Sequence, residues 1–218
     1  MTSQEHTYRR LRKAIMLGRF APGKPVTIRG LAETLNTSPT PVREALRRLS
    51  SEHGLTLLPN RRIVVPKMTA ERFRELILLR VSLETHAAVR ALPYVNDIMI
   101  ERLAETDARI DEAVARQDRE AQIIENQRFH SAIYSANPHT VAMPMIESVW
   151  LQLGPFNRIA ARHVKQLYKI DRHEEALAAL RARDPLALSI AIENDIKDGV
   201  GHMSELALQA ILGDEAAA

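Results

Sequence analysis

The feature that most restricts the fold is a pair of short helical segments joined by a tight turn. The first covers residues 28–35, and Asn36 can adopt the left-handed conformation that ends it. The second begins after Ser38, a good helix N-cap, with Pro39 at the first helical position, where a missing N–H has no cost. Its apolar residues recur at helical spacing, at Val42, Ala45, Leu46 and Leu49. Two such segments predict a helix-turn-helix.

The opposite side of the second segment is polar and basic, at Thr40, Arg43, Arg47 and Ser50. A planar guanidinium can contact guanine edges or phosphates when its helix enters the major groove. Downstream, "LTLLPNRRIVVPK" predicts a two-stranded hairpin with Arg61 and Arg62 at its tip, a wing that can reach the DNA backbone. The order of these elements predicts a DNA-binding winged helix. The plainer alternative is that the arginines only keep a small domain soluble.

Charge is distributed unevenly along the chain. Residues 1–67 contain 13 Lys and Arg against 4 Asp and Glu, whereas the remaining residues contain 17 against 23. A basic segment joined to an acidic one indicates a domain boundary and a polyanionic partner for the first domain. We therefore expect a DNA-binding domain at 1–67, a second domain at 68–212 and a disordered tail at 213–218.

The cellular compartment can be inferred from what the sequence lacks. The chain has no cysteine, which is typical of a protein that works in a reducing compartment. Its first residues are charged and do not resemble a signal peptide. Apolar runs fall short of the ~18 residues that a membrane span needs. We expect a cytoplasmic protein that does not enter a membrane.

The second domain reads as helical throughout. Its helices are expected to begin or end at proline, asparagine and aspartate residues. In the basic domain, a further helix is expected at 4–17. The expected ranges are 70–92, 97–117, 118–135, 141–153, 157–167, 171–183 and 185–212. Short connections between them predict an antiparallel bundle. The fold class is therefore mainly α: a winged helix-turn-helix with a small β-hairpin, followed by an all-α bundle.

Four polar residues lie on inward faces of three predicted helices. Asn126 and His130 are one turn apart, His173 precedes an apolar stripe, and Asp195 shares a face with Leu188 and Ile192. A buried carboxylate needs a partner, and imidazole with carboxylate oxygen suits Zn²⁺, Ni²⁺, Mn²⁺ or Fe²⁺. The alternative is a metal-free polar pocket in which Asp195 pairs directly with His173.

The expected helix at 70–92 carries Arg80 on an inward stripe. The stripe also contains Phe73, Ile77, Glu84, Ala87 and Ala88. A guanidinium in apolar surroundings requires a carboxylate. That carboxylate is either Glu84, one turn along the helix, or an acidic ligand.

The basic domain resembles the N-terminal domain of the GntR family of bacterial transcription regulators. The resemblance rests on "I-x-x-G-x-x-x-P-G" from Ile15, "R-x-LA-x-x-L" from Arg29 and "S-x-TPVREALRRL". It implies that Arg29, Thr40 and Arg43 contact operator DNA. Pro39 and Arg62 depart from the family, which often has arginine and glycine at these positions. The residues expected at the DNA are Arg29, Ser38, Thr40, Arg43, Arg47, Arg61 and Arg62.

Residues 70–212 resemble the FCD domain of the FadR-like subfamily. Many members bind a metal through an Asp or Asn four residues before an "FH" histidine, with two more histidines. The resemblance therefore implies the ligand set Asn126, His130, His173 and Asp195, in which Asp195 replaces the last histidine. Zn or Ni is the expected divalent metal. Arg80 and Glu84 match the "R-x-x-L-E" of the first FCD helix, and ligands in the family are small organic or sugar acids.

These resemblances imply a ligand-responsive transcription regulator, most simply a repressor, that binds double-stranded operator DNA as a homodimer. One alternative is an architectural DNA-binding dimer that has no effector. Another is a metal-dependent enzyme that uses His130, His173 and Asp195. Because the sequence offers no separate base, nucleophile or cofactor loop, we do not expect an enzyme.

Overall fold

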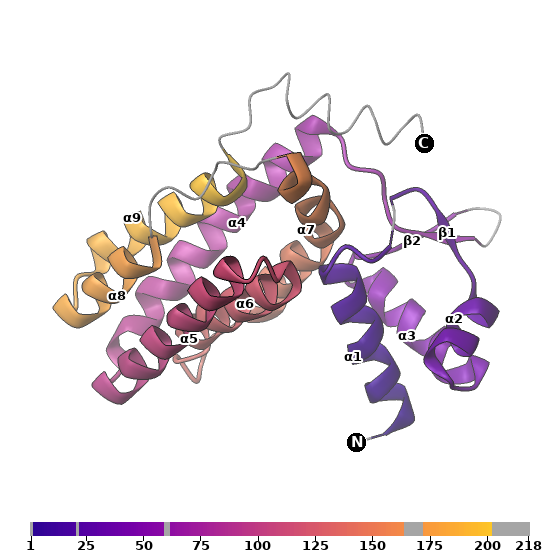
Figure 1. Ribbon diagram of the computed structural model, residues 1–218, viewed down its shortest axis with the longest axis horizontal. Coiled ribbons are helices and arrows are strands. Elements are labelled where there is room, and N and C mark those ends of the chain that lie inside the picture. Colours follow the sequence, from indigo (N-terminus) through magenta and orange to yellow (C-terminus); the bar gives the residue numbers. More distant parts are fainter. Residues whose placement is uncertain (1, 21, 59–61, 164–171, 202–218) are drawn as a thin grey trace. The chain divides into compact units, whose positions relative to one another are not determined.

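The computed structural model describes residues 2–20, 22–58, 62–163 and 172–201 (Figure 1). The chain divides into two compact units. The first contains the described residues of 1–74 and 147–165, and the second contains those of 75–146 and 166–202. Each unit is therefore assembled from separate stretches of the chain.

The first unit contains the predicted helix-turn-helix. Helix α1 (Ser3–Met16) precedes α2 (Ile28–Leu35) and α3 (Pro39–Ser51), and α3 packs against both. Asn36 ends α2 with a φ of 50°, as its side chain type predicts. Ser38 is the N-cap residue of α3, but its side chain makes no capping hydrogen bond. The fixed φ of Pro39 is therefore the main local restraint on the start of α3.

A three-stranded antiparallel sheet completes the winged helix. Strand β3 (Ile63–Val64) lies between β1 (Pro25–Val26) and β2 (Thr56–Leu57). Val64 pairs with Pro25 on one side and with Thr56 on the other. The hairpin of β2 and β3 matches the predicted wing. Strand β1 was not predicted from the sequence, because two prolines and a glycine hide its short extended segment.

Helix α7 (Met143–His163) contributes its residues from 147 onward to the first unit. A Cβ atom on Gly154 would lie 2.5 Å from the Cα atom of Met16, so glycine permits α7 to touch the end of α1. The Ser148 hydroxyl donates to the Glu52 carbonyl at 2.8 Å. The prediction of separate helices at 141–153 and 157–167 was wrong, because α7 continues through Pro155; residues 164–167 lie outside the described residues.

The second unit is a bundle of helices (Figure 1). It contains most of α4 (Ala70–Ala91), a 3₁₀ turn (Leu92–Tyr94), α5 (Asp97–Ala115), α6 (Arg119–Tyr134), α8 (Arg172–Ala182) and α9 (Pro185–Ile196). Helix α5 packs against α6 and α8, and α8 packs against α9. This arrangement confirms the predicted all-helical second domain.

Side-chain caps fix where these helices begin. Asn96, Asp118 and Asp184 each accept hydrogen bonds from backbone amides in the first turn of the helix that follows. Helix α9 ends earlier than its predicted range of 185–212, and a π-helical turn follows it at Lys197–Gly201. Residues 202–218, which include the predicted tail at 213–218, lie outside the described residues. Among the helices that the structure describes, none has the length and apolar character required to cross a membrane.

Candidate functional site

The outer face of the helix-turn-helix presents most of the residues predicted to contact DNA. The exposed side chains are those of Arg29, Ser38, Thr40, Arg43, Arg47 and Arg62. Arg61 lies outside the described residues. The opposite side of α3 buries Val42, Ala45, Leu46 and Leu49 completely or almost so, as the helical spacing predicts.

The arginines of this unit fall into two groups. In the part of the chain that the structure describes, Arg29 and Arg43 make no ion pair with a carboxylate. Arg47 is 77% exposed and lies 3.7 Å from Glu44, a pair that solvent screens strongly. These guanidiniums remain available to a polyanion, which is what a phosphate-contacting surface requires.

Arg48 belongs to the second group, because its charge is paired with residues of the same unit although its side chain is half exposed. Its guanidinium lies 3.6 Å from the centre of the Tyr8 ring and 3.1 Å from both Glu5 and Glu52. The Tyr8 hydroxyl donates to Glu52 at 2.7 Å. Burial and this hydrogen bond raise the pKa of Tyr8 to about 12. The network joins α1 to α3, so Arg48 serves the fold.

The second unit contains a cluster of polar side chains from three helices. His130 and Asn126 come from α6, His173 from α8 and Asp195 from α9. The side chains of His130, His173 and Asp195 are exposed by 1%, 3% and 5%. Burial to this degree removes the water that would otherwise satisfy their nitrogen and oxygen atoms.

The donor atoms of the cluster point at a common region. His130 Nε2 lies 3.1 Å from Asp195 Oδ2, and His173 Nε2 lies 3.6 Å from Asp195 Oδ1. The Asn126 Oδ1 atom lies 3.1 Å from His173 Nε2. Ligand atoms of one tetrahedral ion with bonds of about 2.1 Å are about 3.4 Å apart. The observed separations therefore suit a shared cation.

Two further side chains orient the imidazole rings. His173 Nδ1 lies 2.7 Å from the Asp107 carboxylate on α5, which must receive a proton from it. The Tyr134 hydroxyl donates to Glu84 at 2.9 Å and lies 3.1 Å from His130 Nδ1, so it can accept the proton of that nitrogen. With its Nδ1 atom engaged in this way, each ring can present the lone pair of its Nε2 atom to a cation.

Hydrogen bonding within the cluster leaves an atom unsatisfied. Although His130 Nε2 is 3.1 Å from Asp195, the contact lacks hydrogen-bond geometry, and this nitrogen has no hydrogen-bond partner among the residues that the structure describes. His130 Nε2, His173 Nε2 and the Asp195 carboxylate thus converge on one buried region. Such a set fits a divalent cation with nitrogen and oxygen ligands.

Arg80 and Glu84 extend the cluster along α4. Arg80 Nε lies 2.5 Å from Glu84 Oε1, and Glu84 is fully buried. Of the two partners that the sequence allowed for Arg80, the structure therefore contains the carboxylate of Glu84. Burial and the Glu84 charge raise the pKa of Tyr134 well above its usual value, so this phenol stays neutral.

The carboxylates in and around the cluster also favour binding of a cation. Burial acts to raise the pKa of the Asp195 carboxyl, but His130, His173 and Arg80 outweigh burial and hold this pKa well below its usual range. Asp107, Asp195 and Glu84 place three carboxylates in or beside the cluster, and Arg80 places one guanidinium there. A divalent ion would neutralise this charge in surroundings of low dielectric constant.

Sequence reasoning missed Asp107 and Tyr134. Both had a readable signal: Asp107 lies on the stripe of α5 that buries Leu103 and Ile110, and Tyr134 follows His130 by one helical turn. The four predicted ligands, Asn126, His130, His173 and Asp195, are brought together, as are Arg80 and Glu84.

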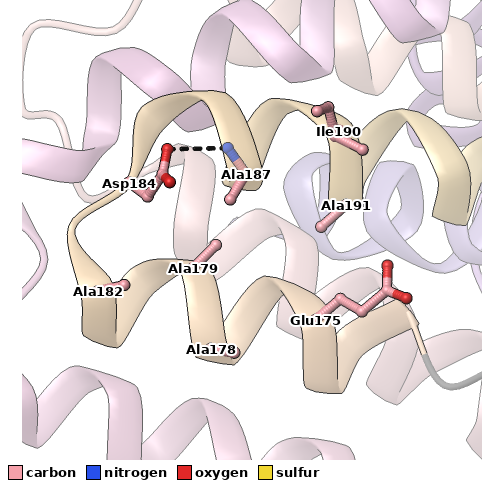
Figure 2. A pocket seen from close by; sticks show the side chains of 8 residues that line it. All are labelled: Glu175, Ala178, Ala179, Ala182, Asp184, Ala187, Ile190 and Ala191. Atoms are coloured by element: carbon pink, nitrogen blue, oxygen red, sulfur yellow. Dashed lines mark hydrogen bonds between the residues drawn. The ribbon is translucent and has the colours of Figure 1, made fainter.

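A groove on the outside of the second unit is separate from this cluster. Figure 2 shows it between α8 and α9. Its volume is about 460 Å³. Five alanines, Ile190, Glu175 and Asp184 line it, and Asp184 accepts a hydrogen bond from the Ala187 amide across its end. In the described part of the chain, none of the cluster's side chains contributes to this lining.

Two family models match the chain. The model described as bacterial regulatory proteins, gntR family, matches residues 3–65, and the FCD domain model matches residues 75–198. These matches coincide with the winged helix and with the bundle that contains the polar cluster.

Individual relatives extend the similarity over almost the whole chain. The HTH-type transcriptional regulator McbR of Escherichia coli K12 is 30% identical over 179 residues, 80% of each chain. The HTH-type transcriptional repressor RspR of the same strain is 23% identical over 89% of this chain and 86% of its own. The solved structure of E. coli McbR/YncC has a TM-score of 0.84, 26% identity and coverage of 99% and 100%. A GntR regulator from Rhodococcus sp. RHA1 has a TM-score of 0.73 and 26% identity, with coverage of 98% and 99%.

Proposed function

Because the chain belongs to the GntR family of bacterial regulatory proteins and carries an FCD domain, we propose that it is a ligand-responsive repressor acting in the cytoplasm. Its winged helices bind operator DNA, and its bundle holds a divalent cation and a small acidic effector. DNA binding and transcription regulation follow from the family. Repression, the homodimer, the metal and the effector are the parts proposed here.

The basic face of α3 supports the proposed mode of operator binding. Arg43 and Arg47 project from the exposed side of the helix, with Thr40 and Ser38 at its beginning and Arg29 on α2. Two copies on a two-fold axis would place two such helices in successive major grooves. Arg62 on the wing would contact the backbone beside them.

The unsatisfied His130 nitrogen is the single observation that carries the proposed metal site. His130 and His173 would supply nitrogen ligands, and Asn126 and Asp195 would supply oxygens. Zn²⁺ or Ni²⁺ suits this set, and when bound it would act as a Lewis acid toward an anionic ligand. Asp107 and Tyr134 orient the two rings, as such partners do in metal sites generally.

The proposed effector is a small carboxylic or sugar acid that binds beside Arg80 and the metal ligands. Arg80 is paired with Glu84 in the structure, so an acid would compete with Glu84 for the guanidinium. Binding would thereby change the hydrogen bond between Glu84 and Tyr134, and through it the His130 ring. An effector with different affinities for two conformations of the dimer shifts their populations, and hence DNA binding.

A combined binding experiment tests the proposal. Purified protein, loaded with Zn²⁺ or Ni²⁺, is titrated with duplexes from the region next to its own gene, and then with a panel of small acids. The proposal predicts specific binding to one duplex and its release by one class of acid. Specific binding that no acid changes would favour an architectural dimer, and conversion of an acid would favour an enzyme.

A further inference from the structure

Two of the proposed metal ligands lie at the ends of their helices. His173 is the second residue of α8, and Asp195 is the last but one residue of α9. These two ends lie together, because α8 and α9 pack as an antiparallel pair joined through Arg183 and Asp184 (Figure 1). Helix ends fray, since their terminal turns lack part of the backbone hydrogen bonding of the interior. A ligand in such a turn therefore keeps its position only if another contact holds the end in place.

An ion pair connects these two helix ends directly. Arg172, the neighbour of His173, donates from Nε to the Asp198 carboxylate at 2.7 Å, across 26 positions of the chain. Asp198 lies in the π-helical turn that follows α9, three residues after Asp195. The side chains of Arg172 and Asp198 are only 17% and 21% exposed, so salt and water weaken this contact less than a pair on the open surface.

Stabilisation of the individual helices does not account for the two charges of this pair. A cation at the first position of a helix and an anion beyond its last turn both oppose the helix dipole. Arg172 and Asp198 occupy these two unfavourable positions, and each compensates the charge of the other. Glu175, in the first turn of α8, lies 2.6 Å from Nη1 of Arg172 and restrains the guanidinium from a second side. The pair is therefore best explained by the contact that it makes between α8 and α9.

We propose that Arg172 and Asp198 are positioning residues of the metal site, a clamp that keeps His173 and Asp195 close enough to share one cation. The Nε2 atom of His173 and the Oδ1 atom of Asp195 are 3.6 Å apart in the structure. Because His173 directly follows Arg172, and Asp195 is less than one helical turn from Asp198, opening the clamp displaces both ligands. The inference rests on the metal site of the proposed function and concerns residues that do not themselves bind the ion.

The opposite charges of the clamp separate positioning from simple electrostatics. Loss of the Arg172 charge alone would strengthen the binding of a cation nearby, and loss of the Asp198 charge alone would weaken it. A clamp predicts the same direction for both changes, because either one releases the ends of α8 and α9. Arg172→Met and Asp198→Asn should therefore each lower the affinity for Zn²⁺ by about 10-fold, measured by competition with a chromophoric chelator.

Three further variants show whether the contact between the helices is responsible. Glu175→Gln is the matched control: it removes the other carboxylate at the same guanidinium, leaves the clamp intact and should bind Zn²⁺ as the wild type does. Arg172→Lys keeps a cation opposite Asp198 and should recover most of the affinity that Arg172→Met loses. The double variant Arg172→Met with Asp198→Asn should lose about 10-fold, as either single variant does, because the two residues act as one unit.

The possible results distinguish the clamp from the metal site on which it rests. Affinity that rises in Arg172→Met and falls in Asp198→Asn would show that the pair acts through charge alone, and the clamp would be wrong. Unchanged affinity in both variants, or an equal loss in Glu175→Gln, would also overturn the clamp, while the metal site would stand. A wild-type protein that binds no Zn²⁺ would overturn both. Circular dichroism checks that each variant keeps its helices, and Arg172→Gln replaces Arg172→Met if the latter does not.

Discussion

The Asp107 carboxylate lies 2.7 Å from Nδ1 of His173, on the side of the ring opposite the other polar residues of the cluster. This contact fixes which ring nitrogen carries the proton and points the Nε2 lone pair of His173 toward Asp195. Two neighbouring helices, α5 and α8, are thereby held in the orientation that the proposed metal site needs.

Asp107→Asn should lower metal affinity by about 10–100-fold, because the amide oxygen can still accept the His173 proton but no longer carries charge. Competition with a chromophoric chelator measures the change. The exposed Glu105→Gln on the same helix is the matched control and should bind metal as the wild type does. Equal metal affinity in the two variants would show that Asp107 does not support the metal site.

His130→Ala combined with Asp195→Ala should abolish metal binding, because it removes one nitrogen and one oxygen ligand at once. Elemental analysis after dialysis should fall from about one ion per chain to background. His86→Ala, which alters an exposed histidine on α4, should retain the ion. Unchanged metal content in the double variant would show that the ligands lie elsewhere.

Arg43→Ala should weaken operator binding by about 10–150-fold and reduce the salt dependence by about one counterion. The guanidinium is exposed on α3 and makes no ion pair in the described chain, so the fold should survive its loss. Fluorescence anisotropy at two salt concentrations measures both quantities. Arg181→Ala on α8 removes an equal charge far from the α3 surface in sequence, and it should bind normally. Wild-type affinity in Arg43→Ala contradicts the assignment.

Gly154→Ala should destabilise the first unit by about 1–3 kcal/mol, because the new methyl group would overlap the backbone of Met16. Alanine is the better helix former, so a loss of stability can only come from that contact. Urea unfolding gives the difference. Gly199→Ala is the control, since a Cβ atom there meets nothing within 4 Å, and it should change stability by less than about 0.5 kcal/mol.

The Tyr8 hydroxyl should make stability depend on pH in the alkaline range. Burial and Glu52 raise its pKa to about 12 in the folded protein, against about 10 in the unfolded chain. The folded state therefore binds the proton more tightly, and its stabilisation, present below about pH 10, is lost as the pH rises toward 12. Because solvent screens the site, the loss should be roughly 1 kcal/mol. Tyr8→Phe should lack this loss of stability. Urea unfolding of both proteins at pH 9 and 11.5 gives the difference in their free energies of unfolding. A difference that is the same at both pH values would be inconsistent with the raised pKa.

Local signals were sufficient to predict most of the helix boundaries. Asn36, Pro39, Asn96 and Asp184 act through their own backbone or through the next turn, so their effects are readable in the sequence. Pro155 shows the limit of such signals. Proline interrupts helices in general, yet α7 continues past it, in a segment where Gly154, Ser148 and Phe156 make tertiary contacts.

Helical periodicity could place Asn126, His130, His173 and Asp195 on inward faces, because each face follows from spacing along a single helix. It could not show which other helices would meet them. The contact between His173 and Asp107 spans 66 residues, and that between Tyr134 and Glu84 spans 50. Contacts of this kind depend on how the bundle is assembled, which no single helix encodes.

The close approach of Gly154 to Met16 affects how this regulator can be rebuilt. A chimaera that joins the first 67 residues to a foreign sensor would lack the part of α7 that packs against α1. An exchangeable cassette would have to include the α7 segment from Glu147 onward, although some 70 residues of sensor sequence, from 75 to 146, come before it in the chain.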